Sequence, residues 1–140
     1  MIDHQTALIY TMVLASVSDA EMTDAEFHRI GHIISNLPVF EGFDRNDLPA
    51  AVEKCADLLD DEKGLENAFA IIKKSLPKKL RETAYALACD VVVVDGDVQQ
   101  EELRLLELAR HELAVDRLVA AGIERGASAR FATYSPKDDE

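Results

Sequence analysis

The chain of 140 residues is long enough for one compact domain with a buried core, and 48% hydrophobic and 30% charged residues are ordinary globular values. Its formal net charge of −12 argues against a nucleic-acid-binding protein, because neutralisation of phosphate charge supplies most of the affinity in such complexes. No apolar stretch reaches membrane-spanning length, since Asp90 interrupts the longest one, and no basic segment precedes an apolar one near residue 1. We therefore expect a soluble, cytoplasmic protein without a transmembrane segment.

Apolar residues recur with helical spacing through most of the chain, and this periodicity predicts an all-α, single-domain bundle of about seven helices. The expected helices span residues 5–18, 24–36, 46–61, 65–75, 78–94, 98–113 and about 115–132. The residues after 132 lack apolar periodicity, so we expect them to fray. The sequence therefore predicts one helical domain over residues 1–132 and a frayed C-terminal tail over residues 133–140.

A pattern of helix, acidic turn and helix occurs twice in the chain. A shift of 76 positions aligns Asp19 with Asp95, and the same shift aligns Glu26 with Glu102. The bundle is therefore expected to consist of two related halves. The repeat also bears on residues 91–94, a run of four valines that favours a strand in isolation. We expect a helix there, because the repeat aligns this run with the end of the first helix and no other segment offers a strand for pairing.

Local capping explains part of each acidic turn. Thr23 and Glu26 have the spacing of a capping box, which predicts a helix start near residue 24. Met22 and Phe27 have the spacing of a hydrophobic staple around the same start. In the second copy Gly96 suits a tight turn. Capping does not require an acidic residue at both ends of a turn, so the repeated carboxylates are the candidate functional residues. They are Asp19, Glu21, Glu26, Asp95, Asp97 and Glu102.

Carboxylate oxygens are the ligands that hard cations prefer, so these six acids form a candidate site for Ca²⁺ or Mg²⁺. The spacing is not that of an EF-hand, because the glutamate comes at the eighth position of the turn and not at the twelfth. An alternative is that the acids serve only as caps and as favourable charges at helix N-termini. Zn²⁺ is less favoured: His28 and His32 lie one helical turn apart, but no third ligand is fixed by spacing.

The sequence contains no recognisable catalytic arrangement. Cys55 and Cys89 lie among apolar residues, which indicates small core residues and not a disulfide. The serines and cysteines come without the partner residues that nucleophilic catalysis needs, and nothing indicates that Glu26 and Glu102 meet as an acid and a base. We therefore expect a non-enzymatic protein.

Charge is unevenly distributed along the chain. Residues 1–62 contain 13 acidic and 3 basic side chains, whereas residues 63–140 contain 14 and 12. The alternative to metal binding is therefore a metal-independent helical interaction module whose acidic half docks a basic protein partner. The basic cluster around Pro77 is a weak footprint for an anionic partner and suits the adjoining helix ends.

The chain resembles the TerB-like family, a group of small all-helical bacterial proteins associated with tellurite resistance, from about Ala7 to Arg130. The resemblance rests on an acidic turn that ends in a glutamate, DGDVQQEE at 95–102 and, in degenerate form, DAEMTDAE at 19–26, each after a buried helix. Ala20 stands where the family usually has glycine, which affects the geometry of the first turn. The resemblance implies metal binding through these acids, a role in resistance to tellurite and other stresses, and protein partners at the membrane or in the cytoplasm.

Overall fold

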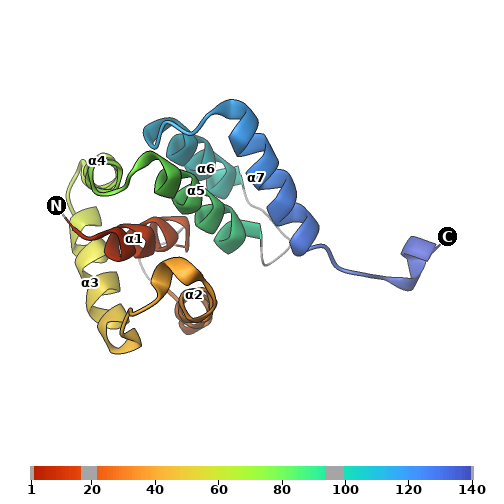
Figure 1. Cartoon of the computed structure of the whole chain (residues 1–140), viewed down its shortest axis with the longest axis horizontal. Coiled ribbons are helices and arrows are strands. Elements are labelled where there is room, and N and C mark those ends of the chain that lie inside the picture. The colour runs from red at the N-terminus through yellow and green to blue at the C-terminus, as the bar shows by residue number, and fades with distance from the viewer. Residues whose placement is uncertain (1, 17–21, 94–99, 140) are drawn as a thin grey trace.

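The computed structural model describes residues 2–16, 22–93 and 100–139 (Figure 1). Over these residues the chain forms seven α-helices and no strand, which confirms the predicted all-α class. The α-helices are α1 (His4–Ser16), α2 (Asp24–Asn36), α3 (Leu48–Leu59), α4 (Gly64–Ser75), α5 (Lys78–Val93), α6 (Gln100–Glu112) and α7 (Arg117–Arg130). Short 3₁₀ helices occur at η1 (Pro38–Phe40), η2 (Arg45–Asp47) and η3 (Pro136–Asp139).

Helix α1 is the centre of the bundle. Every residue from Ala7 to Ser16 is buried. The two polar residues in this stretch satisfy their hydroxyls within the helix: Thr11 Oγ1 donates to the carbonyl of Ala7 and Ser16 Oγ to that of Met12, both at 2.9 Å. Figure 1 shows α5 on one side of α1 and α2 and α3 on the other, and α4 also packs against α1. A helix that is buried all round is covered by neighbours on every face.

Helix α5 is the main partner of α1 and contains the valine run. Val91, Val92 and Val93 are helical, which confirms the helix prediction for these three positions, whereas Val94 lies outside the described residues. Val91 and Val92 are buried, with exposed fractions of 4% and 1%. Their burial in the core outweighs the preference of β-branched residues for strands, because strand propensity mainly reflects packing context.

Several helix boundaries differ from the prediction for identifiable reasons. The third helix begins at Leu48, because Asp44 caps a separate 3₁₀ turn by accepting from the Asn46 N–H at 2.9 Å. The fourth begins at Gly64, where a Cβ atom would lie 2.4 Å from the Leu58 carbonyl oxygen, so the close approach of two helix ends requires glycine. The seventh begins after Asp116, whose carboxylate accepts from two backbone N–H groups of the first turn.

The repeat aligns α2 (24–36) with α6, which is described from Gln100 to Glu112. Their surroundings differ: Phe27 on α2 is half-buried, whereas the aligned Leu103 on α6 is 54% exposed. Equivalence of the two halves in three dimensions stays a prediction.

The C-terminal residues leave the bundle after α7 (Figure 1). Instead of a fully irregular tail, they include the 3₁₀ turn η3, in which the Asp138 N–H donates to the Ser135 carbonyl at 2.8 Å. All described residues from Ala132 onwards are exposed, so this turn is held by local hydrogen bonds and not by the core. None of the helices in the described parts of the chain combines the length and apolar character that crossing a bilayer requires.

The central position of α1 predicts a large difference between two leucine truncations. Leu8 on α1 is fully buried, so Leu8→Ala should lower the free energy of unfolding by about 2–5 kcal/mol through lost burial and a residual cavity. Leu118→Ala is the matched control, because Leu118 is 81% exposed and its truncation should change stability by less than about 0.5 kcal/mol. Urea unfolding measures both, and similar losses in the two variants would contradict a core centred on α1.

Candidate functional site

The two acidic turns lie between the described parts of the chain. Asp19, Glu21, Asp95 and Asp97 fall outside the described residues, so the site predicted from them stays a prediction. Their flanks are described: the buried helices α1 and α5 end at Ser16 and Val93. The surface helices α2 and α6 follow, each with acidic residues in its first turn.

Glu26 completes the cap predicted for α2. Its Oε1 accepts hydrogen bonds from the backbone N–H and the hydroxyl of Thr23, both at 2.9 Å, and Thr23 Oγ1 accepts from the Glu26 N–H at 3.2 Å. Met22 and Phe27 are half-buried against the core, as a staple at this helix start requires. The capping box is complete with Thr23 and Glu26, so it needs no further carboxylate.

Glu102 and the histidine pair lie on different helices, α6 and α2. Glu102 is half-buried in the first turn of α6. His28 and His32 are exposed on α2, and the Asn36 side-chain amide donates to the His32 carbonyl at 2.7 Å. Within residues 2–16, 22–93 and 100–139, no three His, Cys, Asp or Glu side chains gather in a group that could hold a metal ion. The histidine pair therefore gains no third ligand from the described residues.

The two cysteines are unpaired and buried, which confirms the prediction of small core residues. Burial raises the pKa of each thiol to about 12. Cys55 lies between α1 and α3, where its Sγ is 3.9 Å from the Tyr10 carbonyl oxygen. Because a nucleophilic cysteine must be a thiolate near neutral pH, neither side chain is suited to that chemistry.

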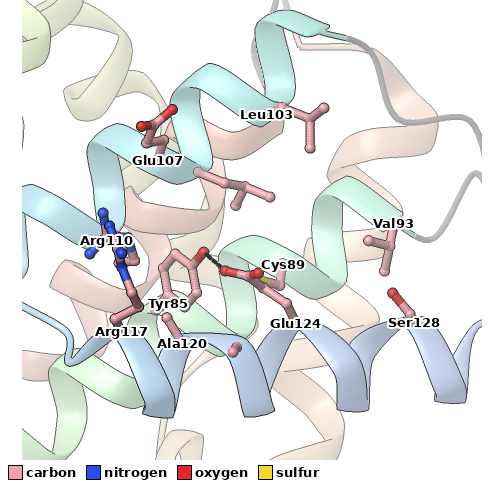
Figure 2. A pocket seen from close by; sticks show the side chains of 12 residues that line it. Tyr85, Cys89, Val93, Leu103, Glu107, Arg110, Arg117, Ala120, Glu124 and Ser128 are labelled. Atoms are coloured by element: carbon pink, nitrogen blue, oxygen red, sulfur yellow. Dashed lines mark hydrogen bonds between the residues drawn. The ribbon is translucent and has the colours of Figure 1, made fainter.

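Sequence reasoning missed a groove between α5, α6 and α7 (Figure 2). Its volume of about 580 Å³ lies in the range of small-molecule pockets. Two arginines, Arg110 and Arg117, lie toward one end, while Val93, Leu103 and Ser128 lie toward the other. The remaining lining residues are Tyr85, Cys89, Leu106, Glu107, Ala120, Ala121 and Glu124.

A hydrogen bond from α5 to α7 crosses the floor of this groove. The Tyr85 hydroxyl donates to Glu124 Oε2 at 2.5 Å, and Figure 2 shows the two side chains pointing toward each other. Tyr85 is buried with only 1% of its surface exposed. Burial, aided by this hydrogen bond, raises the pKa of Tyr85 well above its usual value near 10, so the phenol remains a donor. The bond therefore fixes the Glu124 carboxylate inside the groove.

A second polar contact joins α7 to α5 at the C-terminal end of α7. Arg130 Nη2 lies 2.5 Å from Asp90 Oδ1, and the Asp90 side chain is only 21% exposed. Burial raises the pKa of Asp90, while the Arg130 hydrogen bond and charge lower it in part. Asp90 on α5 therefore anchors the last turn of α7 through Arg130.

The groove exists because α7 is built from small residues where it crosses α5. Ala120 and Ala127 are buried at this crossing, and Ala121 and Ser128 line the groove. Small side chains let the two helices approach while leaving space above their contact. The signal in the sequence was the alanine-rich and glycine-rich composition of residues 120–129, but composition does not reveal which helix covers it.

The fold and the groove define a small all-α bundle whose central helix is buried on every side. Residues 5–123 match the family described as tellurite resistance protein TerB. This match covers most of the 140 residues, and the chain belongs to the TerB family. Searches of curated proteins and of solved structures gave no significant match.

The Tyr85 hydrogen bond predicts a pH-dependent loss of stability. Tyr85→Phe should lower the free energy of unfolding by about 1 kcal/mol at neutral pH, because the bond to Glu124 is lost. The raised pKa of Tyr85 means that its stabilising contribution is complete below pH 10 and is lost as pH rises above this usual value. The difference between wild type and variant should therefore shrink in alkaline solution.

Urea unfolding of both proteins between neutral pH and about pH 11 measures this difference. Tyr134→Phe is the matched control, because Tyr134 is 70% exposed and bonds only to Asp139 in the tail, so its loss should not change global stability. A stability difference for Tyr85→Phe that is independent of pH would contradict the role of its phenol as donor.

Proposed function

We propose that this member of the TerB family is a non-enzymatic tellurite-resistance and stress-response protein that binds a divalent cation through its acidic turns. The ligands would come from Asp19, Glu21 and Glu26 in the first turn and from Asp95, Asp97 and Glu102 in the second. Ca²⁺ and Mg²⁺ suit such oxygen ligands better than Zn²⁺ does.

The observation that supports this proposal is the surplus of carboxylates beyond capping. The capping box of α2 is satisfied by Thr23 and Glu26 alone. Capping of α2 therefore does not account for the other acids in the turn. Carboxylates that lie close together repel one another unless a cation neutralises them. A bound cation would convert this repulsion into attraction.

A second candidate function is docking of a basic protein partner, and a specific observation favours it. The acidic side chains around α3 are exposed to solvent, and their number far exceeds that of the basic ones there. They are Asp44, Asp47, Glu53, Asp57, Asp60, Asp61 and Glu62. A surface of one charge sign accelerates encounter with an oppositely charged partner.

The metal proposal is tested by the response of thermal stability to cations. The chelator-treated full chain should melt at a higher temperature in millimolar Ca²⁺ or Mg²⁺, since a ligand that binds only the folded state stabilises it. Asp95→Asn should abolish this shift and leave the cation-free protein no less stable, because it removes a repulsive charge. Glu102→Gln should weaken the shift, and Asp19→Asn should have the smaller effect because Ala20 resists conformations that Gly96 permits.

The matched control is Asp57→Asn on α3, which removes an exposed acid outside both turns and should leave the cation shift intact. Calorimetric titration with Ca²⁺, Mg²⁺, Mn²⁺ and Zn²⁺ identifies the preferred ion. An equal cation shift in wild type, Asp95→Asn and Glu102→Gln would rule out the second turn as the site. If Asp95→Asn or Glu102→Gln instead lowers the free energy of unfolding by about 0.5–2 kcal/mol in chelator, the replaced acid has a purely structural role.

The docking candidate predicts a strong effect of salt. Binding of a lysine-rich peptide to the α3 surface should weaken steeply as ionic strength rises, because exposed charges are screened over about 8 Å at physiological salt. Replacing Asp57, Asp60 and Asp61 by asparagine should weaken binding further, whereas Asp138→Asn and Asp139→Asn in the tail should not. Binding that is insensitive to salt would argue against this candidate.

A further inference from the structure

Two helices that line the groove, α6 and α7, each present a neutral, an acidic and a basic side chain in the same order along it. Along α7, Ser128, Glu124 and Arg117 line it in succession. Along α6 the order is Leu103, Glu107, Arg110. Figure 2 shows both arginines toward the same end of the groove. Over the described residues, the lining therefore runs from a neutral end, past carboxylates, to a pair of guanidinium groups.

The neutral end is mainly apolar. Val93 of α5 and Leu103 of α6 lie at this end. Leu103 is 54% exposed, and it stands over this end of the groove (Figure 2). Covering this surface with an apolar side chain would remove it from water, which is favourable in proportion to the area buried.

The charged side chains Glu124, Arg110 and Arg117 can each form further polar contacts with a ligand in the groove. Glu124 Oε2 accepts from Tyr85, while Oε1 has no hydrogen-bond partner among the described residues. Arg110 and Arg117 likewise form no ion pair with any residue in the described parts of the chain. Two neighbouring guanidinium groups attract a carboxylate, and a fixed carboxylate attracts an ammonium group.

The spacing of these charges sets the length of the ligand. Glu124 and Arg117 lie seven residues apart on α7, which corresponds to about 10 Å along the helix axis. An extended peptide of two or three residues spans about 7–11 Å. A free amino acid carries both charged groups on the same carbon atom and is too short to reach both ends.

We propose that this groove binds short zwitterionic peptides of two or three residues with an apolar N-terminal side chain. The side chain would occupy the end lined by Val93 and Leu103, the terminal ammonium would pair with Glu124, and the terminal carboxylate would pair with Arg110 and Arg117. Neither Glu26 nor Glu102, the two acids of the proposed metal site that the structure describes, lines the groove, and the inference uses none of the six acids.

The test is calorimetric titration of the full chain with the peptides Leu-Leu and Leu-Leu-Ala. We expect saturable binding, and we expect N-acetylation or C-amidation of either peptide to weaken it about tenfold, because each removes one charge-assisted contact. Free leucine, and a fatty acid of similar length that lacks the ammonium group, should bind more weakly than the peptides. Absence of binding, or equal binding of the blocked peptides or the fatty acid, would overturn the proposal.

Three variants separate the groove from the rest of the surface. Glu124→Gln keeps an acceptor for Tyr85 but removes the charge, and Arg117→Gln removes one guanidinium; each should weaken peptide binding about tenfold. Arg125→Gln is the matched control, since Arg125 is exposed on α7 but does not line the groove. Thermal unfolding without peptide checks that each variant is folded. Unchanged affinity in folded Glu124→Gln and Arg117→Gln would overturn the assignment.

Discussion

The burial of α1 is the constraint on which the rest of this structure depends. A helix without a solvent-facing side needs cover over its whole circumference, and α2, α3, α4, α5 and α6 all contact it. The Thr11 and Ser16 hydroxyls bond back to carbonyls of α1 itself, so they need no partner from a neighbour. The surrounding helices are then free to turn their polar faces outward, and the exposed acids around α3 lie on such a face.

Helix α7 stands apart from this arrangement because it packs mainly on α5. Small residues at the crossing allow close contact, and the Tyr85–Glu124 and Asp90–Arg130 pairs fix the helix at two points along its length. Attachment by small residues and polar pairs leaves open space beside the contact, whereas large apolar side chains would have filled it. The groove is therefore a consequence of how the outermost helix is attached.

Much of the fold could be predicted from the sequence because apolar periodicity is a local signal. It identified every α-helix among the described residues, and the α2 boundaries and capping box agree with the prediction. Other boundaries depended on tertiary contacts, such as the close approach that requires Gly64. The candidate site shows the same limit: Glu26 could be recognised as a cap from spacing, but the groove joins residues from three helices, and only the packing of α7 brings Tyr85 and Glu124 together.

The long separation between α1 and its main partner also affects how the protein is made. Helix α1 ends at Ser16, whereas α5 is complete only at Val93. At synthesis rates of about 5–20 residues per second, the apolar surface of α1 waits on the order of 4–15 s for α5 to be finished. During that interval the emerging chain exposes the apolar residues of α1, and exposed apolar surface of this kind is prone to aggregation.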